Sequence, residues 1–305
     1  MKLAPITLFV YNRPWHTKQT IEALKKNRLA KDSELFIFSD GPENENSKET
    51  VRETREYIKT INGFKKVEIV EREKNLGLAN SIISGVSKIV DQYGRIIVLE
   101  DDMISSRYFL KYMNDALNLY EEKKQVISIH AYVYPTKKIL PETYFLKGAD
   151  CWGWATWKRG WDLFESDGQK LLQELEIKKL TKEFDFDGSY PYTKMLKDQI
   201  AGKNNSWAIR WYASAFLKNK LTLYPGKSLV DNIGLDGSGT HCNGDNNFGK
   251  KNQIKDLEIE VKKIDIKESL EARLAVIDFL KRESSLWIRG FKYFKMILKK
   301  YASKN

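Results

Sequence analysis

The chain has 305 residues, 42% of them hydrophobic, which is enough apolar material for a large α/β domain and excludes an intrinsically disordered protein. Its two cysteines, Cys151 and Cys242, are far apart and lack a CxxC neighbour, so the sequence excludes a disulfide framework and a structural zinc knot. The net charge of +11 does not indicate a nucleic-acid-binding protein, because residues 281–305 alone carry +7 of it.

The first 130 residues alternate short apolar runs with longer amphipathic ones, a pattern typical of βαβ units. Strands are predicted at residues 6–11, 35–38, 67–70, 95–99 and 125–130, and helices at 14–26, 47–60, 79–90 and from about 105 to 120. The start of the chain has no signal-peptide pattern, and no apolar run approaches the length of a membrane span. We therefore predict a cytoplasmic α/β protein with a mainly parallel, Rossmann-like sheet flanked by helices.

From about residue 135 the alternation loosens and aromatic residues become denser. The pattern predicts a Lys-rich helix near 168–183, a polar loop at 184–192, a helix from 207 and a strand at 221–225. We predict a single domain over residues 1–265, followed by a helical, basic segment at 266–305.

Three acidic residues, Glu100, Asp101 and Asp102, directly follow the apolar strand at 95–99. Ligands of open α/β sheets bind outside the carboxyl ends of the strands. Three adjacent carboxylates repel one another there unless a cation neutralises them, and Mn²⁺ or Mg²⁺ prefers such oxygen ligands. The alternative is that these acids cap the next helix or are solvated at the strand end.

A series of short motifs in fixed order resembles bacterial family 2 glycosyltransferases of the GT-A type, over about residues 4–245. The motifs are Val10-Tyr11-Asn12-Arg13-Pro14, Phe38-Ser39-Asp40-Gly41-Pro42, Asn75-Leu76-Gly77-Leu78, Leu99-Glu100-Asp101-Asp102, Trp152-Gly153-Trp154-Ala155-Thr156-Trp157 and Asp231-Asn232-Ile233-Gly234 with Thr240-His241. The chain is more distantly similar to N-acetylglucosaminyltransferase I, which has the same Glu-Asp-Asp motif. The resemblance implies a nucleotide-sugar-binding half at 1–131 and an acceptor-side half at 132–265.

The resemblance also implies roles for individual residues. The donor, a sugar linked to uridine diphosphate, would be bound by Tyr11, Asn12, Arg13, Asp40, Asn75, Gly77, Glu100 and Asp101. Asp102 would bind the metal. His241 lies in a Gly-rich loop that is typical of a lid, and in similar enzymes such a histidine meets the metal or the diphosphate. Without the resemblance, Asp40 is equally well explained as a turn residue and His241 as a surface histidine.

On the acceptor side, Trp152 and Trp154 are predicted to place two indoles on one face at strand spacing, as a wall for sugar stacking. Trp207 and Arg210 are further acceptor candidates, with core packing as the alternative for the tryptophans. An inverting displacement needs a carboxylate base. The similarity to N-acetylglucosaminyltransferase I implies an aspartate just before a tryptophan, in the segment after the aromatic cluster. The matching stretch here, residues 204–207, has no acid, which leaves Asp198 and Asp150 as candidates, Asp198 slightly favoured.

The end of the chain has an amphipathic pattern. Five apolar residues follow helical spacing while basic residues occupy the other faces: Trp287, Phe291, Phe294, Leu298 and Tyr301. Residues 284–305 are thus predicted either to lie on an anionic membrane surface, at the inner face of the cell membrane, or to dock on the domain.

The sequence therefore favours a metal-dependent, inverting hexosyl- or N-acetylhexosaminyltransferase that acts on a glycan or lipid-linked glycan, for example in polysaccharide biosynthesis. Two alternatives remain open. One is a nucleotidyltransferase of similar fold, although Asn12-Arg13-Pro14-Trp15 does not look like its phosphate loop. The other is a catalytically silent, membrane-peripheral binding protein.

Overall fold

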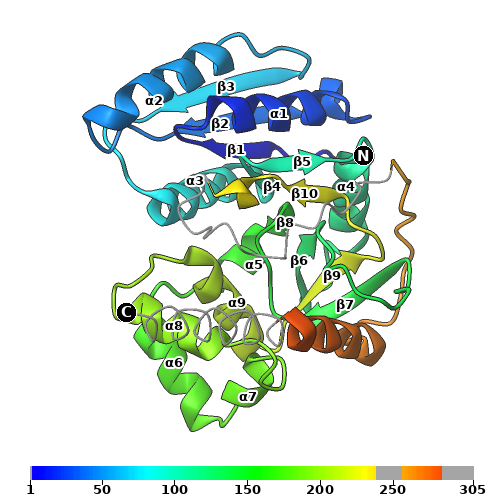
Figure 1. Ribbon diagram of the computed structural model, residues 1–305. Coiled ribbons are helices and arrows are strands. Elements are labelled where there is room, and N and C mark those ends of the chain that lie inside the picture. Colours follow the sequence, from blue (N-terminus) through cyan, green and yellow to red (C-terminus); the bar gives the residue numbers. More distant parts are fainter. Residues whose placement is uncertain (1, 238–255, 284–305) are drawn as a thin grey trace, which may run out of the picture.

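The computed structural model describes residues 2–237 and 256–283. A mixed eight-stranded sheet forms the middle of the molecule (Figure 1). In spatial order its strands are β3 (Lys66–Glu71), β2 (Glu34–Ser39), β1 (Ile6–Val10), β4 (Arg95–Glu100), β8 (Trp154–Trp157), β6 (Val126–His130), β9 (Leu221–Pro225) and β7 (Thr143–Lys147). The predicted α/β fold is confirmed.

The first four strands of this order form the parallel part of the sheet, built from βαβ units as the sequence predicts. α1 (Pro14–Lys25), α2 (Glu45–Ile58) and α4 (Phe109–Leu119) pack on one face, and α3 (Leu78–Tyr93), α5 (Lys158–Trp161) and α9 (Trp207–Leu217) on the other. β1 is buried along its whole length, with Leu8 in one core cluster and Phe9 in the other. Local signals start and stop these helices: Pro14 begins α1, and Gly94 ends α3 at a φ of 77°.

The second part of the sheet contains antiparallel pairs that the sequence pattern missed. β8 lies antiparallel between β4 and β6, and β7 lies antiparallel to β9. A separate two-stranded ribbon pairs β5 (Met103–Ser105) with β10 (Val230–Asn232). A short 3-10 turn, η2 (Gly234–Asp236), follows β10. The ribbon brings residues 230–236 to the turn that follows β4.

Several helices form a separate group next to the part of the sheet that contains β9 and β7 (Figure 1). α6 (Gly168–Ile177), α7 (Thr181–Phe184), α8 (Tyr192–Ile200), part of α9 and the helical residues 270–283 share one apolar cluster. The single helix predicted at 168–183 is instead two, because Lys179 takes a φ of 56° between α6 and α7.

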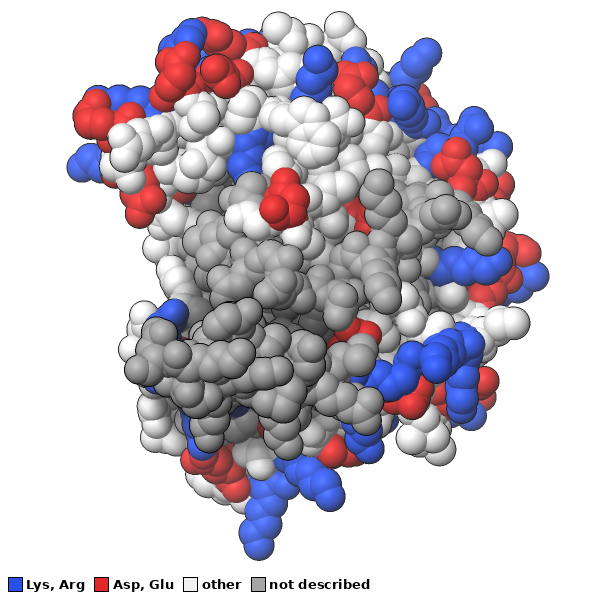
Figure 2. Space-filling model, in the orientation of Figure 1, with Lys and Arg blue, Asp and Glu red and all other residues white. Residues whose placement is uncertain are grey.

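Charged side chains of both signs are interspersed around the rim of the face in Figure 2. Within the described residues, no helix is long and apolar enough to cross a membrane. The amphipathic segment predicted at 284–305 lies outside those residues, as do His241 and Cys242.

Candidate active site

Three acidic residues lie at the carboxyl edge of the sheet, where β4 ends. Glu100 is its last residue, and Asp101 and Asp102 form the turn into β5. Because β1 runs parallel to β4, residues 11–13 leave the sheet at the same edge. The structure therefore brings the predicted metal ligand Asp102 together with the predicted donor residues Arg13 and Asp101, which come from separate motifs.

The two aspartates are paired with Arg13, the residue before α1. Arg13 Nη2 lies 2.7 Å from Asp102 Oδ2 and also hydrogen-bonds Asp101 Oδ1, while Arg13 Nε donates to Asp101 Oδ2 at 3.4 Å. The side chains of Arg13, Asp101 and Asp102 are only 18%, 7% and 13% exposed. Two buried atoms of this group, Arg13 Nη1 and Asp102 Oδ1, have no hydrogen-bond partner among the described residues.

Burial and mutual repulsion perturb the protonation of the acids. Burial, reinforced by the charges of Asp102 and Asp101, raises the pKa of Glu100 to about 8. Burial also raises the pKa of Asp101 to about 6, against the opposing charge of Arg13. Burial disfavours the charged guanidinium, but the two aspartates together raise the pKa of Arg13. Glu100 thus holds its proton at neutral pH, and the site favours an added positive charge.

The donor set fits a hard cation in its chemistry, since the buried Asp102 Oδ1 is a carboxylate oxygen without a partner. Within the described residues, however, no group of three His, Cys, Asp or Glu side chains is arranged around a common point. His241, the predicted second ligand, lies outside these residues. The contact that Asp102 does make is with Arg13.

Gly234 closes the other side of Asp102. A Cβ atom at this position would lie 2.1 Å from Asp102 Oδ2 and 2.9 Å from Arg13 Nη1, so only glycine leaves room here. The backbone joins the two segments as well, because Ile233 N donates to the Asp102 carbonyl at 2.9 Å. Beyond it, Asp236 Oδ2 lies 3.1 Å from His16 Nε2 on α1. Residues 230–236 therefore form a wall of the site, a role the sequence motif did not reveal.

Asp40 joins two of the predicted donor motifs to each other. Its carboxylate accepts hydrogen bonds from Leu76 N and Gly77 N at 3.0–3.1 Å, at the start of α3. Asn75 Nδ2 returns a bond to the Gly41 carbonyl at 2.8 Å, and a Cβ on Gly41 would lie 2.6 Å from the backbone of residue 74. Both Asp40 oxygens are thus engaged in holding the loop, which accounts for these residues without a nucleotide.

Tyr11 and Asn12, two further members of the predicted donor set, are partly exposed. Tyr11 Oη accepts a hydrogen bond from Glu43 N at 3.0 Å. The Asn12 side chain has no hydrogen bond among the described residues, so its amide is free to bind a ligand. Trp15, the second residue of α1, is 59% exposed.

Of the two candidate bases, Asp150 lies near the acid cluster. Its Oδ1 accepts from Cys151 N at 2.8 Å, and Tyr134 Oη donates to its Oδ2 at 3.4 Å. Burial, together with the charges of Asp150, Glu100 and Asp102, raises the pKa of the Cys151 thiol. The Asp150 side chain remains 23% exposed.

His130 fixes the backbone beside Asp150. It is fully buried, and burial lowers its pKa, so the ring is neutral. Its Nε2 accepts from Trp152 N at 3.1 Å, and Nδ1 therefore carries the proton and donates to the Tyr132 carbonyl at 3.0 Å. The same Nε2 is 3.9 Å from Asp150 Oδ1.

Asp198 lies on α8, in the helical group. Its carboxylate is ion-paired with Lys194 on the preceding turn and lies 3.6 Å from Lys203 Nζ. The hydrogen bond from Lys194 lowers the pKa of Asp198. A carboxylate that is stabilised as an anion by two lysines is a weak proton acceptor.

The prediction that Trp152 and Trp154 place their indoles on one face is wrong. Gly153 takes a φ of 62° and β8 begins only at Trp154, so Trp152 packs against Tyr132 in one cluster while Trp154 lies in another. Trp154 and Trp207 are 1% and 3% exposed and stack on each other in the core. Arg210 is buried as well, and its guanidinium donates to the carbonyls of Ser206 and Ser166. Trp152 alone of these four acceptor candidates is partly exposed.

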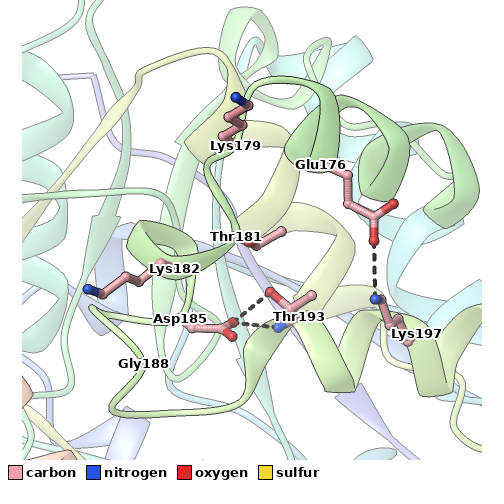
Figure 3. Close-up of a pocket in the computed structure, with 8 residues that line it drawn as sticks. All are labelled: Glu176, Lys179, Thr181, Lys182, Asp185, Gly188, Thr193 and Lys197. Carbon is pink, nitrogen blue, oxygen red and sulfur yellow. Dashed lines mark hydrogen bonds and ion pairs between the residues drawn. The ribbon is translucent and has the colours of Figure 1, made fainter.

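A hollow of about 550 Å³ lies in the helical group (Figure 3), and none of the three acids at 100–102 lines it. In it Glu176 pairs with Lys197 at 3.1 Å, and Asp185 accepts two hydrogen bonds from Thr193. Lys179 and Lys182 point in different directions (Figure 3). These side chains do not converge on a common ligand position.

Comparison with known proteins gives one sequence match. Residues 6–144 match the family model described as glycosyl transferase family 2, so the family resemblance is confirmed. No curated protein matches the chain. The more distant similarity to N-acetylglucosaminyltransferase I stays a prediction.

Matches among solved structures have low sequence identity and low TM-scores. The mannosyltransferase PcManGT from Pyrobaculum calidifontis, in complex with GDP-Man and Mn²⁺, is 13% identical with a TM-score of 0.32, over 44% of this chain and 37% of that one. S. aureus TarS is 15% identical with a TM-score of 0.31, over 46% of this chain and 24% of TarS. A UDP-glucose pyrophosphorylase complexed with UDP-glucose is 12% identical with a TM-score of 0.36, over 73% and 90%. The chain thus spans well under half of the first two relatives.

Proposed function

With residues 6–144 as a family 2 glycosyl transferase domain, we propose that the chain transfers a hexosyl or N-acetylhexosaminyl group from a nucleotide-sugar, UDP-linked, to a hydroxyl of a glycan or glycolipid. The observation that carries this proposal is the acid cluster, which lies at the carboxyl edge of the parallel strands beside the donor motifs of β1. The free amide of Asn12 and the exposed ring of Trp15 offer contacts for a nucleotide there.

A divalent cation belongs to this proposal. Asp102 would hold it through the unpartnered Oδ1, with His241 as the proposed second ligand. The chemistry that such an ion supplies is neutralisation of the departing nucleoside diphosphate.

Asp150 is the proposed general base. It would accept the proton of the acceptor hydroxyl while that oxygen forms its bond to the anomeric carbon, and the bond from that carbon to the diphosphate breaks, which inverts the configuration. Its partial exposure and the absence of a lysine partner among the described residues support this assignment over Asp198, which is held by two lysines. Tyr134 Oη would steady the carboxylate.

The first test is donor hydrolysis. Purified protein is incubated with a panel of nucleotide-sugars and Mn²⁺, and nucleoside diphosphate is measured. Slow release without an acceptor is expected, because water replaces the acceptor hydroxyl. Release of pyrophosphate would indicate a nucleotidyltransferase instead, and the absence of both hydrolysis and nucleotide binding would leave a non-catalytic binding protein.

The second test separates the two bases. Asp150→Asn should keep nucleotide binding, measured by calorimetry, and lower hydrolysis by about 10²- to 10⁴-fold, the usual contribution of a general base. Asp198→Asn is the matched comparator and should behave as the unmodified protein. The reverse result would assign the base to Asp198.

A further inference from the structure

Arg13 already occupies the carboxylates of Asp101 and Asp102, at which a divalent cation would bind. The guanidinium already bridges Asp101 and Asp102 through one nitrogen, Nη2. A divalent cation at Asp102 would lie beside this guanidinium in a site that is largely shielded from water, and the two positive charges would repel each other. The cation and Arg13 therefore compete for the same carboxylates.

The carboxylates themselves have little freedom to move away. Thr20 Oγ1 on α1 donates to the Asp101 carbonyl at 2.7 Å, which fixes this turn to the helix that Arg13 begins. On the opposite side, Ile233 N holds the Asp102 carbonyl and Gly234 lies against its Oδ2. The group able to swing is the Arg13 side chain, which is also the most exposed of the three.

Arg13 also has an unused donor. Its Nη1 is buried without a hydrogen-bond partner among the described residues, so the guanidinium can still bind an anion. A diphosphate is such an anion, and arginine binds phosphate oxygens in a bidentate manner. A displaced Arg13 without a new anionic partner would leave its charge unpaired in a buried site, which is costly.

We propose that Arg13 is the resident counter-ion of Asp101 and Asp102 and that its transfer to the donor diphosphate couples nucleotide binding to metal binding. The inference rests on the proposed donor site. Metal alone binds weakly because it must displace Arg13, and metal with nucleotide binds tightly because Arg13 gains a new partner. Linkage requires the coupling to be reciprocal.

The test measures Mn²⁺ binding without catalysis, by titration calorimetry and by the paramagnetic resonance signal of free Mn²⁺. Arg13→Gln should bind Mn²⁺ more tightly than the unmodified protein in the absence of nucleotide, by about 5- to 150-fold, the usual range of such couplings. In that variant, uridine diphosphate should increase Mn²⁺ affinity by a smaller factor than it does in the unmodified protein. Arg13→Lys keeps a positive charge and should resemble the unmodified protein more closely.

Two controls accompany this comparison. Arg28→Gln removes an exposed arginine that lies 3.8 Å from Glu258, and it should leave Mn²⁺ affinity unchanged. Adding Asp102→Asn to Arg13→Gln should abolish the gain. Equal Mn²⁺ affinity of Arg13→Gln and the unmodified protein, including no binding by either, would overturn the inference, and so would a gain that survives Asp102→Asn. Because the nucleotide-free comparison needs no donor, failure of the proposed transferase activity would be seen separately, in the hydrolysis assay.

Discussion

The proposed donor side and the proposed acceptor side of the molecule are built differently. On the donor side, motifs far apart in sequence hold each other through polar contacts, as Asp40 does with residues 76–77 and Arg13 with Asp101. On the acceptor side, residues that look equally functional are core: Trp154, Trp161, Trp207 and Trp211 pack on one another. The comparison shows that a motif of charged and turn residues locates a site more safely than a motif of aromatics, because aromatic rings serve a core equally well.

The packing role of the tryptophans can be tested by truncating Trp152 and Trp154. Trp154→Ala should destabilise the protein by about 3–5 kcal/mol, as expected for a large buried ring. Trp152→Ala, at a partly exposed ring, should cost less. Denaturant unfolding measures the loss of stability in both variants. A larger loss for Trp152→Ala would contradict the conclusion that Trp154 is the core residue of the two.

On the donor side, Asp102→Asn should strongly lower metal-dependent donor hydrolysis while the fold persists. We expect a loss on the order of a hundredfold, because a fixed charge that stabilises the leaving diphosphate is removed. Nucleoside diphosphate release, with circular dichroism as the folding control, is the measurement. Activity within a few-fold of the unmodified protein would remove Asp102 from the site.

The raised pKa of Glu100 predicts how the stability of the protein depends on pH. Its pKa is about 8 in the folded protein and near 4.5 when unfolded, so the folded state binds the extra proton between these values. Stability should therefore fall as the pH rises from about 5 to 8. Glu100→Gln should remove this part of the slope and stabilise the protein at pH 8–9. Urea unfolding at several pH values tests this, and an unchanged slope would contradict it.

Asp40→Ala should give the smallest change, a destabilisation of about 1–2 kcal/mol, because it removes the acceptor for backbone N–H groups at the start of α3. Asp40→Asn keeps one acceptor oxygen and should lose less. Chemical denaturation compares the two. If both variants keep full stability but lose nucleotide binding, Asp40 contacts the donor directly rather than holding its loop.

Much of the donor half was predictable, because buried parallel strands and capped helices carry local signals, and β1 to β4 end where their apolar runs end. The antiparallel β8 was not, because Gly153 changes the chain direction inside a run that reads as continuous. The partnership of Arg13 with Asp101 was also out of reach, since it depends on side-chain geometry between residues 88 positions apart. The same holds for Gly234, whose need for a small side chain appears only against Asp102.

The β5–β10 ribbon has a consequence for the order in which the chain acquires its site. Asp102 is made early in synthesis, but Ile233 and Gly234, which enclose it, follow more than a hundred residues later. Contacts between such distant segments form late in folding, because a long loop must close first. A nascent or truncated chain that ends before β10 would thus have its parallel strands in place while its acids remain uncovered. Completion of the site would then coincide with completion of the fold, so an unfinished chain would have no competent catalytic centre.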